Sequence, residues 1–510
     1  MTIGNYVKGL QKNRFDNSRN LNTDLISNTL VWLFLVSCIL AIIFIEVKYQ
    51  FPLSLRLDES QSLWQVSHTP SKILEIVSSD VHVPLYHLLL HYWVLVFGFS
   101  VESARSMSLL FAIFSIPAMY LLGWQAFGRK IPALFSVFLL SISPIFNWYG
   151  SEIRMYSLLV LISILNQFFY LRIYRKPSNW AWLGFALTSL LGIYTHYFFW
   201  LLVGVNALFF ILNLEKFGGL KSFQKYCLLG LGLILSFTPW IYLLLSNGTA
   251  SNTKPNLIQP TSVDIFNLYS QFLFGFINES FNSLIVSMWP VVILVVFLLL
   301  QRKRVNSLKA EFKYFMAVIA VPTALAYLIS LAYRPVFLSR YLILVVPSLL
   351  LTISYTLFTF RSRIGDFLKL GLLVIILFGF FEQTVNAYSP VKEDYIQVVT
   401  YLEMKVTTNQ VIAITAPFTI YPFEYYYRGH QKVVTIPDWD RYGPNSIPGF
   451  DQQVFNLQIK QLSRDYNQIW IVYSYNQGYE DSIRNYMRGN YKLVEKSTFS
   501  KDLTLESYQI

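Results

Sequence analysis

Charged residues are scarce in this sequence. They make up 13% of its 510 residues, about half the share of roughly 25% that soluble globular domains carry. Hydrophobic residues make up 54%, and many of them stand in long apolar runs. Little charge together with long apolar runs excludes an ordinary soluble domain and predicts a polytopic membrane protein.

Cysteine is almost absent, and there are no repeats. The two cysteines, Cys38 and Cys227, both lie inside apolar runs, so they give no sign of a disulfide framework. The sequence has no internal repeat or low-complexity run. A cleavable signal peptide is not evident either, because residues 1–28 are polar and basic and the first apolar run is long enough to remain as a span.

The net charge of +12 does not indicate a nucleic-acid partner. The basic residues cluster between the hydrophobic runs, as the cytoplasmic anchors of membrane proteins do. A span needs about 20 apolar residues. We predict about eleven spans, near residues 29–47, 106–126, 131–146, 156–172, 180–195, 198–214, 226–246, 284–301, 314–332, 341–359 and 368–386.

A further apolar stretch at 83–98 is short and carries His87 and His91. If the N-terminus is cytoplasmic and this stretch stays in the interface, every strongly basic loop falls on the cytoplasmic side. If the stretch crosses, those loops turn outward and break the positive-inside rule. We therefore predict an interfacial helix at 83–98, within a first outer loop of residues 48–105.

The region after residue 389 differs in character. Short apolar segments alternate with polar ones, which predicts a small α/β domain. Strands are expected at Val411–Thr415, Lys432–Ile436 and Ile469–Ser474, and helices at Asp394–Lys405, Gln452–Arg464 and Glu480–Met487. The expected organisation is a cytoplasmic segment at 1–28, a transmembrane catalytic domain at 29–388 and an extracytoplasmic α/β domain at 389–510.

The first candidate site residues are the adjacent carboxylates Asp58 and Glu59, a few residues past the first apolar run. A carboxylate at the edge of the bilayer can take the proton of an acceptor hydroxyl, so Asp58 is predicted to be a general base. Glu59 points in a different direction on either a helix or an extended chain. A catalytic role and a structural salt bridge are both open for Glu59.

The second candidate is the segment from Asp80 to Tyr86, in which Asp80 and His82 are two residues apart. On an extended strand both side chains face one way. Such a pair can bind a divalent metal or hold a phosphate. The alternative is that Asp80 caps the helix that begins at Pro84.

The third candidate is a short outer loop with Glu152, Arg154 and Tyr156. An arginine beside the headgroup layer suits a phosphate, because its fork matches the phosphate oxygens. An Arg–Glu pair that anchors the end of a span is the alternative.

Three more residues lie on the same predicted side of the membrane. His196 lies at an outer turn between two spans, and Arg334 and Arg340 flank the outer end of another. The arginines are candidates for an anionic lipid phosphate, with simple snorkelling as the alternative. We expect all these side chains to meet in one cavity at the outer lip of the bilayer.

These motifs resemble those of membrane glycosyltransferases of the GT-C superfamily. The resemblance is closest to the bacterial relatives of protein O-mannosyltransferases and of the lipid A aminoarabinose transferase, the family 39-like enzymes. It rests on three elements of the sequence: Leu57-Asp58-Glu59, His82-Val83-Pro84-Leu85-Tyr86, and Ser143-Pro144 followed by Ser151-Glu152-Ile153-Arg154-Met155-Tyr156.

The resemblance implies a transferase that uses a polyprenyl-phosphate sugar on the outer face of a bacterial inner membrane. It gives Asp58 the role of base and makes Asp80, His82 and Glu152 candidates for a metal site or for the donor phosphate. From the residues themselves we assign Arg154, Tyr156, Arg334 and Arg340 to the donor phosphate. The resemblance also implies a divalent metal (Mg, Mn or Zn) in some members, with Asp80, His82 and Glu152 as the candidate ligands here. His196 is added as a candidate because it lies on the same predicted side. Val81 stands where some relatives carry an acidic residue, which leaves metal dependence open.

Two other function classes compete with an enzyme. The first is a lipid-linked saccharide transporter or polymerase. A transporter would carry charges inside its spans, whereas here the spans are nearly free of charge. A sensor or scaffold would act through its outer domain alone. Neither the sugar nor the acceptor, which is a protein, a glycolipid or a polysaccharide, follows from the sequence.

Overall fold

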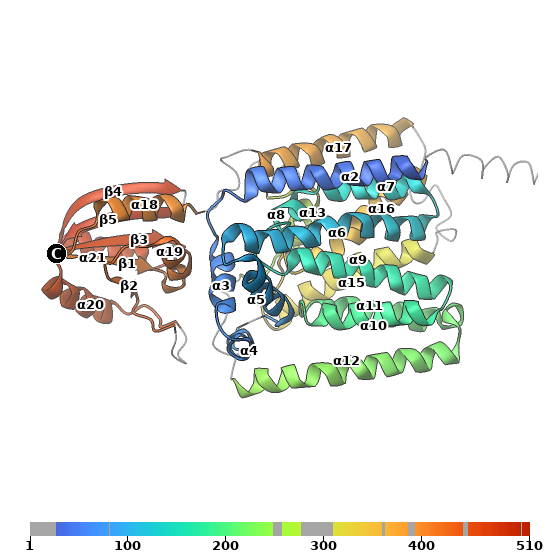
Figure 1. Ribbon diagram of the computed structural model, residues 1–510, viewed down its shortest axis with the longest axis horizontal. Coiled ribbons are helices and arrows are strands. Elements are labelled where there is room, and N and C mark those ends of the chain that lie inside the picture. The colour runs from blue at the N-terminus through green and yellow to red at the C-terminus, as the bar shows by residue number, and fades with distance from the viewer. Residues whose placement is uncertain are drawn as a thin grey trace, which may run out of the picture. The chain divides into compact units, whose positions relative to one another are not determined.

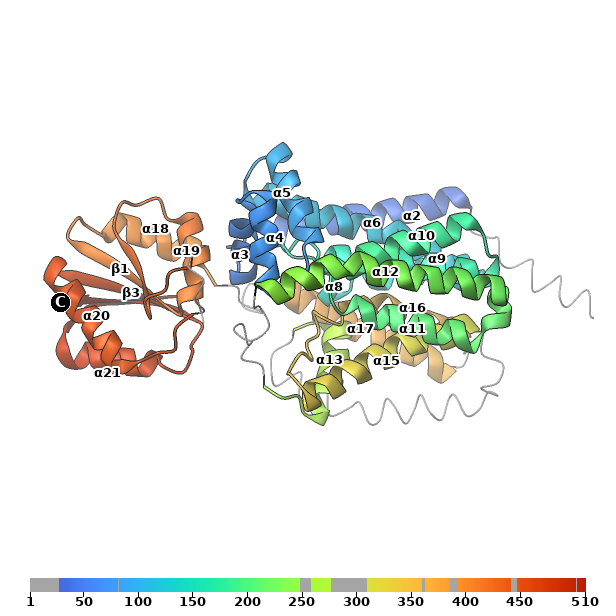
Figure 2. The same cartoon turned by 90° about the horizontal axis from the view of Figure 1, so that it is seen from below.

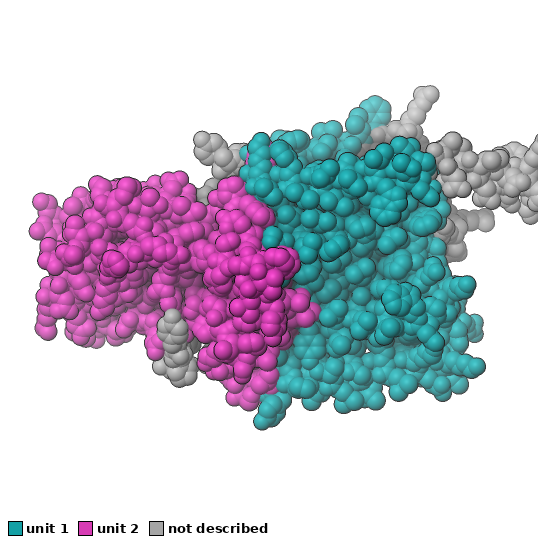
Figure 3. Space-filling view, in the orientation of Figure 1, with its two compact units in different colours: residues 1–48, 106–242, 256–386 teal, residues 49–105, 243–255, 387–510 magenta. Residues whose placement is uncertain are grey.

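The computed structural model describes residues 27–80, 82–247, 258–276, 310–359, 363–385, 393–441, 447–500 and 502–510. These residues form two compact units, which Figure 3 shows in different colours. Unit 1 comprises residues 1–48, 106–242 and 256–386, and unit 2 comprises residues 49–105, 243–255 and 387–510. The domain boundaries predicted from the sequence remain predictions. Residues 49–105 group with the C-terminal region in unit 2, which the sequence did not predict.

Unit 1 is a bundle of apolar helices (Figure 1). Its described helices are α2 (Asn28–Ile45), α6 (Val101–Phe127, whose first residues belong to unit 2), α7 (Lys130–Ser141), α8 (Pro144–Trp148), α9 (Tyr156–Arg175), α10 (Asn179–Ile193), α11 (Phe199–Leu212), α12 (Leu220–Ser246), α13 (Ser262–Phe274), α15 (Ala310–Ala332), α16 (Val346–Thr359) and α17 (Arg363–Thr384). The span predicted at 284–301 lies outside the described residues.

Five described helical segments are long and apolar enough to cross a membrane: Asn28–Gln50, Val101–Phe127, Tyr156–Arg175, Leu220–Ser246 and Ala310–Ala332. The other described helices at predicted spans are shorter apolar helices, so the count of about eleven spans remains a prediction. Helix α12 exposes large apolar side chains such as Leu228, Leu231 and Leu245. An exposed apolar face of this size fits a lipid solvent.

Neutral polar side chains join four helices inside the bundle. Asn206 of α11 donates to Asn166 of α9 at 2.9 Å and accepts from the Tyr314 hydroxyl of α15 at 2.7 Å. Asn166 in turn donates to Thr188 and Ser189 of α10. Such hydrogen bonds hold membrane helices together where hydrophobic burial gives little preference for one packing over another.

Unit 2 begins with three short helices, α3 (Leu57–Val66), α4 (Pro70–Ser78) and α5 (Leu85–Phe97). Glu59 accepts a hydrogen bond from the backbone N–H of Arg56 and so caps the start of α3. Pro70 begins α4, where its fixed φ suits the first helical turn. Helix α5 falls within the stretch predicted as an interfacial helix, and its place in a membrane remains a prediction.

The rest of unit 2 contains a five-stranded sheet with the strand order β2-β1-β3-β5-β4. Strands β1, β2 and β3 are parallel, and β5 pairs antiparallel with β3 and with β4. The strands are β1 (Gln410–Thr415), β2 (Val433–Ile436), β3 (Gln468–Ser474), β4 (Lys492–Ser500) and β5 (Leu503–Gln509). The three parallel strands lie where the sequence predicted strands, whereas the β4–β5 hairpin was not predicted.

Helices cover both faces of this sheet. Figure 2 shows α18 (Tyr395–Lys405) and α19 (Ile420–Tyr426) on one side and α20 (Gln452–Asp465) and α21 (Glu480–Asn490) on the other. Alternate residues of β1 enter the two cores, with Ile412 packed on the α18 side and Val411 on the α20 side. The described part of this region is therefore a three-layer α/β/α arrangement.

Candidate functional site

The predicted site residues fall into one set in each unit, and the first set surrounds α3 in unit 2. Asp58 is half-buried in the first turn of this helix. Gln61 and Gln65 follow at spacings of three and seven residues, so all three lie on one face of the helix. Both glutamine amides donate to Oδ2 of Asp80, at 3.3 and 3.2 Å. The face of α3 that carries Asp58 is thus the face that holds Asp80.

The carboxylate of Glu59 points into the interior of unit 2. Its side chain is fully buried, and it binds the buried Arg105 through both oxygens, at 3.0 and 2.8 Å. One of the same oxygens also accepts from the Arg56 backbone N–H. Of the two alternatives for Glu59, these contacts support the structural salt bridge.

Arg105 organises the segment that leads into α3. Its guanidinium donates to backbone carbonyls as well as to Glu59, so this buried charge has many partners. The accepting carbonyl oxygens belong to Gln50, Phe51, Leu53 and Ser54, at 2.8 to 3.3 Å. The sequence showed Arg105 only as a charge in the first outer loop.

Asp80 and His82 lie close together, as their spacing predicts. Nε2 of His82 is 3.8 Å from Oδ2 of Asp80, and the His82 ring stacks on His87 at a centroid distance of 6.0 Å. Asp80 precedes the Pro84 that caps α5, but its carboxylate accepts hydrogen bonds from Gln61 and Gln65 of α3. This arrangement favours a link between α3 and the loop over a helix cap.

The second set lies in unit 1, around the loop between α8 and α9. Glu152 and Arg154 are buried in this loop, and Tyr156 is the first residue of α9. The hydroxyl of Ser151 donates to the buried Glu46 at 2.6 Å. A Cβ at Gly150 would come within 2.9 Å of the same carboxylate, so glycine lets the loop approach Glu46. Sequence reasoning missed Glu46, although a charge at the end of the first apolar run was visible.

His196 lies within electrostatic reach of two of the predicted arginines. Burial, and then the charges of Arg154 and Arg340, lower the pKa of His196 from 6.5 to about 3, so the imidazole is neutral. Its Nδ1 accepts a hydrogen bond from the backbone N–H of Phe198 at 3.1 Å. A neutral imidazole that accepts at Nδ1 carries its proton on Nε2. Nε2 is therefore a donor that suits an anion.

Aromatic rings line the same cluster. Tyr156 contacts Tyr149 and His196, with ring centroids 4.7 and 6.5 Å apart. Arg340 lies over the Tyr341 ring at 5.6 Å, and that ring is 5.4 Å from His196. We call Arg154, Tyr156, His196 and Arg340 the basic cluster. Arg334 is half-buried and follows the end of α15.

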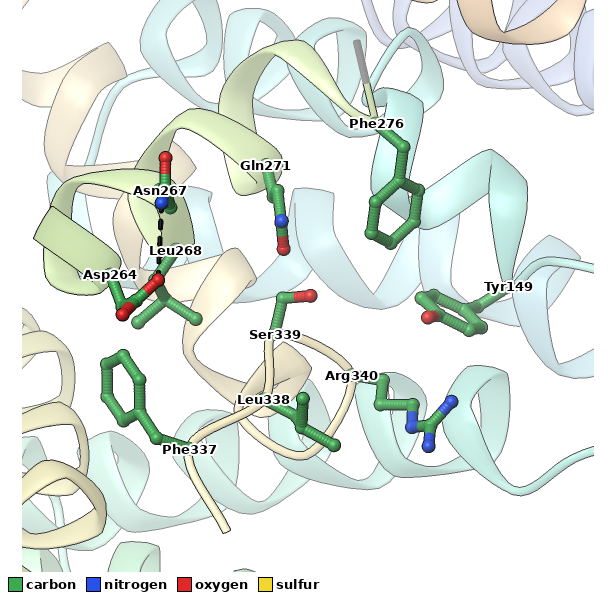
Figure 4. Close-up of a pocket in the computed structure, with 10 residues that line it drawn as sticks. All are labelled: Tyr149, Asp264, Asn267, Leu268, Gln271, Phe276, Phe337, Leu338, Ser339 and Arg340. Carbon is green, nitrogen blue, oxygen red and sulfur yellow. Dashed lines mark hydrogen bonds between the residues drawn. The ribbon is translucent and has the colours of Figure 1, made fainter. Parts of the chain in front are cut away.

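A pocket of about 280 Å³ opens beside Arg340. Figure 4 shows Gln271 pointing toward Ser339 across this pocket, with Arg340 and Tyr149 at one end. Asp264 and Asn267 stand at the other end, hydrogen-bonded to each other. Burial opposes ionisation of Asp264, but hydrogen bonds from Thr261 and Asn267 outweigh it and lower the pKa of Asp264.

The pocket was not predicted. Asp264 and Asn267 belong to the first turns of α13, and Ser339 and Arg340 belong to a loop far along the chain. A set of neutral amides and hydroxyls contributed by separate segments leaves no local motif. Only Arg340 and the outer-side position of the loops could have pointed to it.

The expected metal ligands do not form a metal site among the described residues, where no group of three or more His, Cys, Asp or Glu side chains is placed to hold an ion. His196 fits a cation poorly, because two guanidinium charges act on it and its Nε2 carries a proton. Asp80 and His82 offer two ligands, which is fewer than a zinc site uses.

The chain is similar to known proteins in sequence and in fold. The chain matches the family model for dolichyl-phosphate-mannose-protein mannosyltransferases over residues 81–243. No curated protein matches it. The crystal structure of ArnT from Cupriavidus metallidurans bound to undecaprenyl phosphate is 13% identical, with a TM-score of 0.59 over 94% of this chain and 98% of ArnT.

Two further solved structures are similar. ArnT from the same organism in the apo state is 12% identical over the same shares of both chains, also with a TM-score of 0.59. The Archaeoglobus fulgidus oligosaccharyltransferase, crystallised in complex with Zn and sulfate, is 12% identical with a TM-score of 0.48, over 86% of this chain and 67% of that chain.

The family match and the fold of ArnT confirm the resemblance to GT-C membrane glycosyltransferases. Together with the apolar helices, they identify a multi-pass membrane protein with the GT-C fold. The structural likeness is below 25% identity, so it establishes the fold and leaves the reaction to be argued from the residues.

Proposed function

We propose that this chain, whose fold is that of GT-C membrane glycosyltransferases, transfers a sugar from a polyprenyl-phosphate donor to an acceptor hydroxyl on the outer face of the bacterial inner membrane. One observation carries the proposal. The basic cluster presents two guanidiniums and a neutral imidazole that accepts at Nδ1 and so carries its proton on Nε2. These groups suit a phosphate monoanion or dianion and disfavour a metal or a cationic ligand.

The basic cluster would hold the phosphate of the donor. When the bond between sugar and phosphate breaks, negative charge increases on the phosphate oxygens. Preorganised donors stabilise that charge more strongly than they stabilise the ground state. Arg154 and Arg340 supply the charge, His196 supplies a neutral donor, and the Tyr156 hydroxyl is a further donor. ArnT was crystallised bound to undecaprenyl phosphate, which is a lipid phosphate of this class. Arg334 stays a candidate for the same phosphate.

Asp58 would take the proton of the acceptor hydroxyl as that hydroxyl attacks the anomeric carbon. The oxygen–carbon bond forms as the carbon–phosphate oxygen bond breaks, and the polyprenyl phosphate leaves with the electron pair. A single displacement inverts the anomeric centre. Glu59 remains beside the base as the structural partner of Arg105.

The pocket beside Arg340 suits the sugar of the donor. Its lining combines amides, a hydroxyl and a carboxylate with the rings of Tyr149, Phe276 and Phe337. Such a mixture offers hydrogen bonds to sugar hydroxyls and apolar surface to the faces of the ring. A sugar attached to a phosphate at Arg340 would reach this pocket directly.

The test is a transfer assay with purified protein, together with mass spectrometry of the lipids that co-purify with it. A bound polyprenyl-phosphate sugar names the donor. Asp58→Asn should abolish transfer while it still binds the donor and stays folded, because the amide cannot accept the proton. Wild-type turnover in Asp58→Asn would refute the base. A co-purifying lipid without phosphate would refute the donor class.

A further inference from the structure

We propose that the C-terminal α/β domain positions Asp58, and that it does so through helix α19 and the start of α18. The proposal rests on the role of Asp58 as general base. It assigns a task to residues 393–510, whose sequence shows no catalytic motif, and it makes Tyr426 and Ser54 positioning residues for the reaction.

The first link is at the start of α3. The buried backbone N–H of Leu55 donates to the hydroxyl of Tyr426 at 2.9 Å. The hydroxyl of Ser54 donates to Asp394 at 3.1 Å and accepts from the backbone N–H of Ile396 at 3.2 Å. Three hydrogen bonds thus fasten Ser54 and Leu55, the two residues before the N-cap of α3, to the α/β domain.

The second link is near the other end of α3. The ring of Trp64 lies 5.0 Å from the ring of Tyr421, measured between centroids. Leu55 meets the last residue of α19 and Trp64 meets its second residue, so the two helices run antiparallel along each other. Asp58 lies on the segment of α3 between these two links.

Helix α19 is a firm support because it belongs to the core of the domain. It connects β1 to β2, and Phe423 is fully buried against residues of β1, β3 and α18. Tyr426 adds a neutral contact. Burial raises the pKa of Tyr426 to about 12, so its hydroxyl stays protonated at any working pH and keeps both its donor and its lone pairs.

Other contacts hold α3 from the rest of its surface. Arg105 binds Glu59 and the carbonyls before the helix, and Val66 O contacts Nδ1 of His91 at 2.8 Å. Arg105 holds the carbonyl groups before the helix, and the α/β domain holds the Leu55 N–H and the Ser54 hydroxyl, one turn from Asp58. A general base must stay within hydrogen-bond reach of its proton, and a shift of about 1 Å costs on the order of a hundredfold in rate.

The deciding experiment compares Tyr426→Phe with Tyr427→Phe in the full-length purified protein. Each change removes one hydroxyl. Tyr426 serves the Leu55 N–H, whereas Tyr427 donates to Gln431 within the α/β domain. Tyr426→Phe should lower kcat roughly ten- to a hundredfold, because it displaces the general base. The KM for the donor should not change, because the donor phosphate is assigned to the basic cluster. Amide hydrogen exchange in residues 57–66 should speed up. Tyr427→Phe should leave kcat and that exchange as in the wild type.

A second variant tests whether the effect is specific to the Tyr426 side chain. Ser54→Ala removes the hydrogen bonds to Asp394 and Ile396 and should show the same loss of kcat without a change in donor KM. If Tyr426→Phe and Ser54→Ala keep wild-type kcat and exchange while Asp58→Asn is inactive, the positioning role is wrong and the base stands. If Asp58→Asn is active, the base itself is wrong. An equal loss in Tyr427→Phe would show general damage to the domain and overturn the proposal.

Discussion

At the scale of single residues, the basic cluster shows how one environment sets the role of several side chains. His196 is kept neutral by burial and by Arg154 and Arg340, and its Nδ1 is occupied by a backbone N–H. The sequence predicted an outer-side histidine and two arginines. It also predicted that they meet, but it could not show the protonation state of the imidazole, and so it left His196 as a metal candidate. The tautomer decides against that role, and only the backbone geometry reveals the tautomer.

The cluster predicts a loss of lipid-phosphate affinity when its charge is removed. Arg340→Gln should weaken binding of undecaprenyl phosphate about tenfold or more, because hydrogen bonds to charged groups contribute roughly 1.5–3 kcal/mol each. Arg340→Lys should keep only part of the wild-type affinity, since lysine lacks the planar fork of arginine. Fluorescence or calorimetric titration in detergent measures the affinity. Arg129→Gln, in a basic loop at the start of α7, is the control and should bind normally.

The lowered pKa of His196 also predicts a pH dependence of stability. The unfolded chain takes up a proton at His196 below about pH 6.5, while the folded chain resists it down to about pH 3. The contribution of the neutral His196 to the free energy of unfolding is complete above pH 6.5 and declines as the pH falls from there toward 3. Thermal unfolding in detergent between pH 7.5 and 5 should show a steeper loss in the wild type than in His196→Asn. Parallel curves would contradict the buried neutral imidazole.

At the scale of helices, α3 carries two adjacent carboxylates with different tasks. Asp58 shares a face with Gln61 and Gln65, and Glu59 turns toward Arg105. The sequence alone predicted that neighbours point in different directions on any regular element. It could not name the partner of Glu59, because Arg105 lies 46 residues away along the chain and nothing local marks it.

This division predicts opposite results for two similar substitutions. Glu59→Gln removes the negative charge that balances the buried Arg105. Breaking a buried ion pair lowers the free energy of unfolding by about 3–5 kcal/mol. Purified Glu59→Gln should therefore unfold at a markedly lower temperature than the wild type. Asp58→Asn, on the more exposed face, should unfold close to the wild-type temperature while it loses transfer. Normal stability in Glu59→Gln would show that the pair does not hold this segment.

At the scale of the whole molecule, the sequence predicted some elements of the fold better than others. The parallel strands β1, β2 and β3 lie where short apolar runs predicted them, since both faces of the sheet are covered and each strand is almost continuously apolar. The β4–β5 hairpin was missed because β4 is largely exposed and carries many polar residues. Helices shorter than a span, such as α10 and α11, give no clear count of crossings.

The predicted sidedness is the property of the whole molecule on which the proposed chemistry depends. It follows from the basic loops, which the positive-inside rule places in the cytoplasm, and it puts residues 389–510 outside. The chain is convenient for testing this, because Cys38 and Cys227 are its only cysteines. Both can be replaced by serine before a single reporter cysteine is added.

Lys460→Cys places the reporter on an exposed position of α20, and Lys221→Cys places it on an exposed position in the first turn of α12. In intact cells, a membrane-impermeant maleimide should label the first and not the second, since only the α/β domain faces the outside. Permeabilised cells should label both, which controls for reactivity. Labelling of Lys221→Cys alone in intact cells would reverse the orientation. Asp58 would then face the cytoplasm together with the α/β domain that holds its helix.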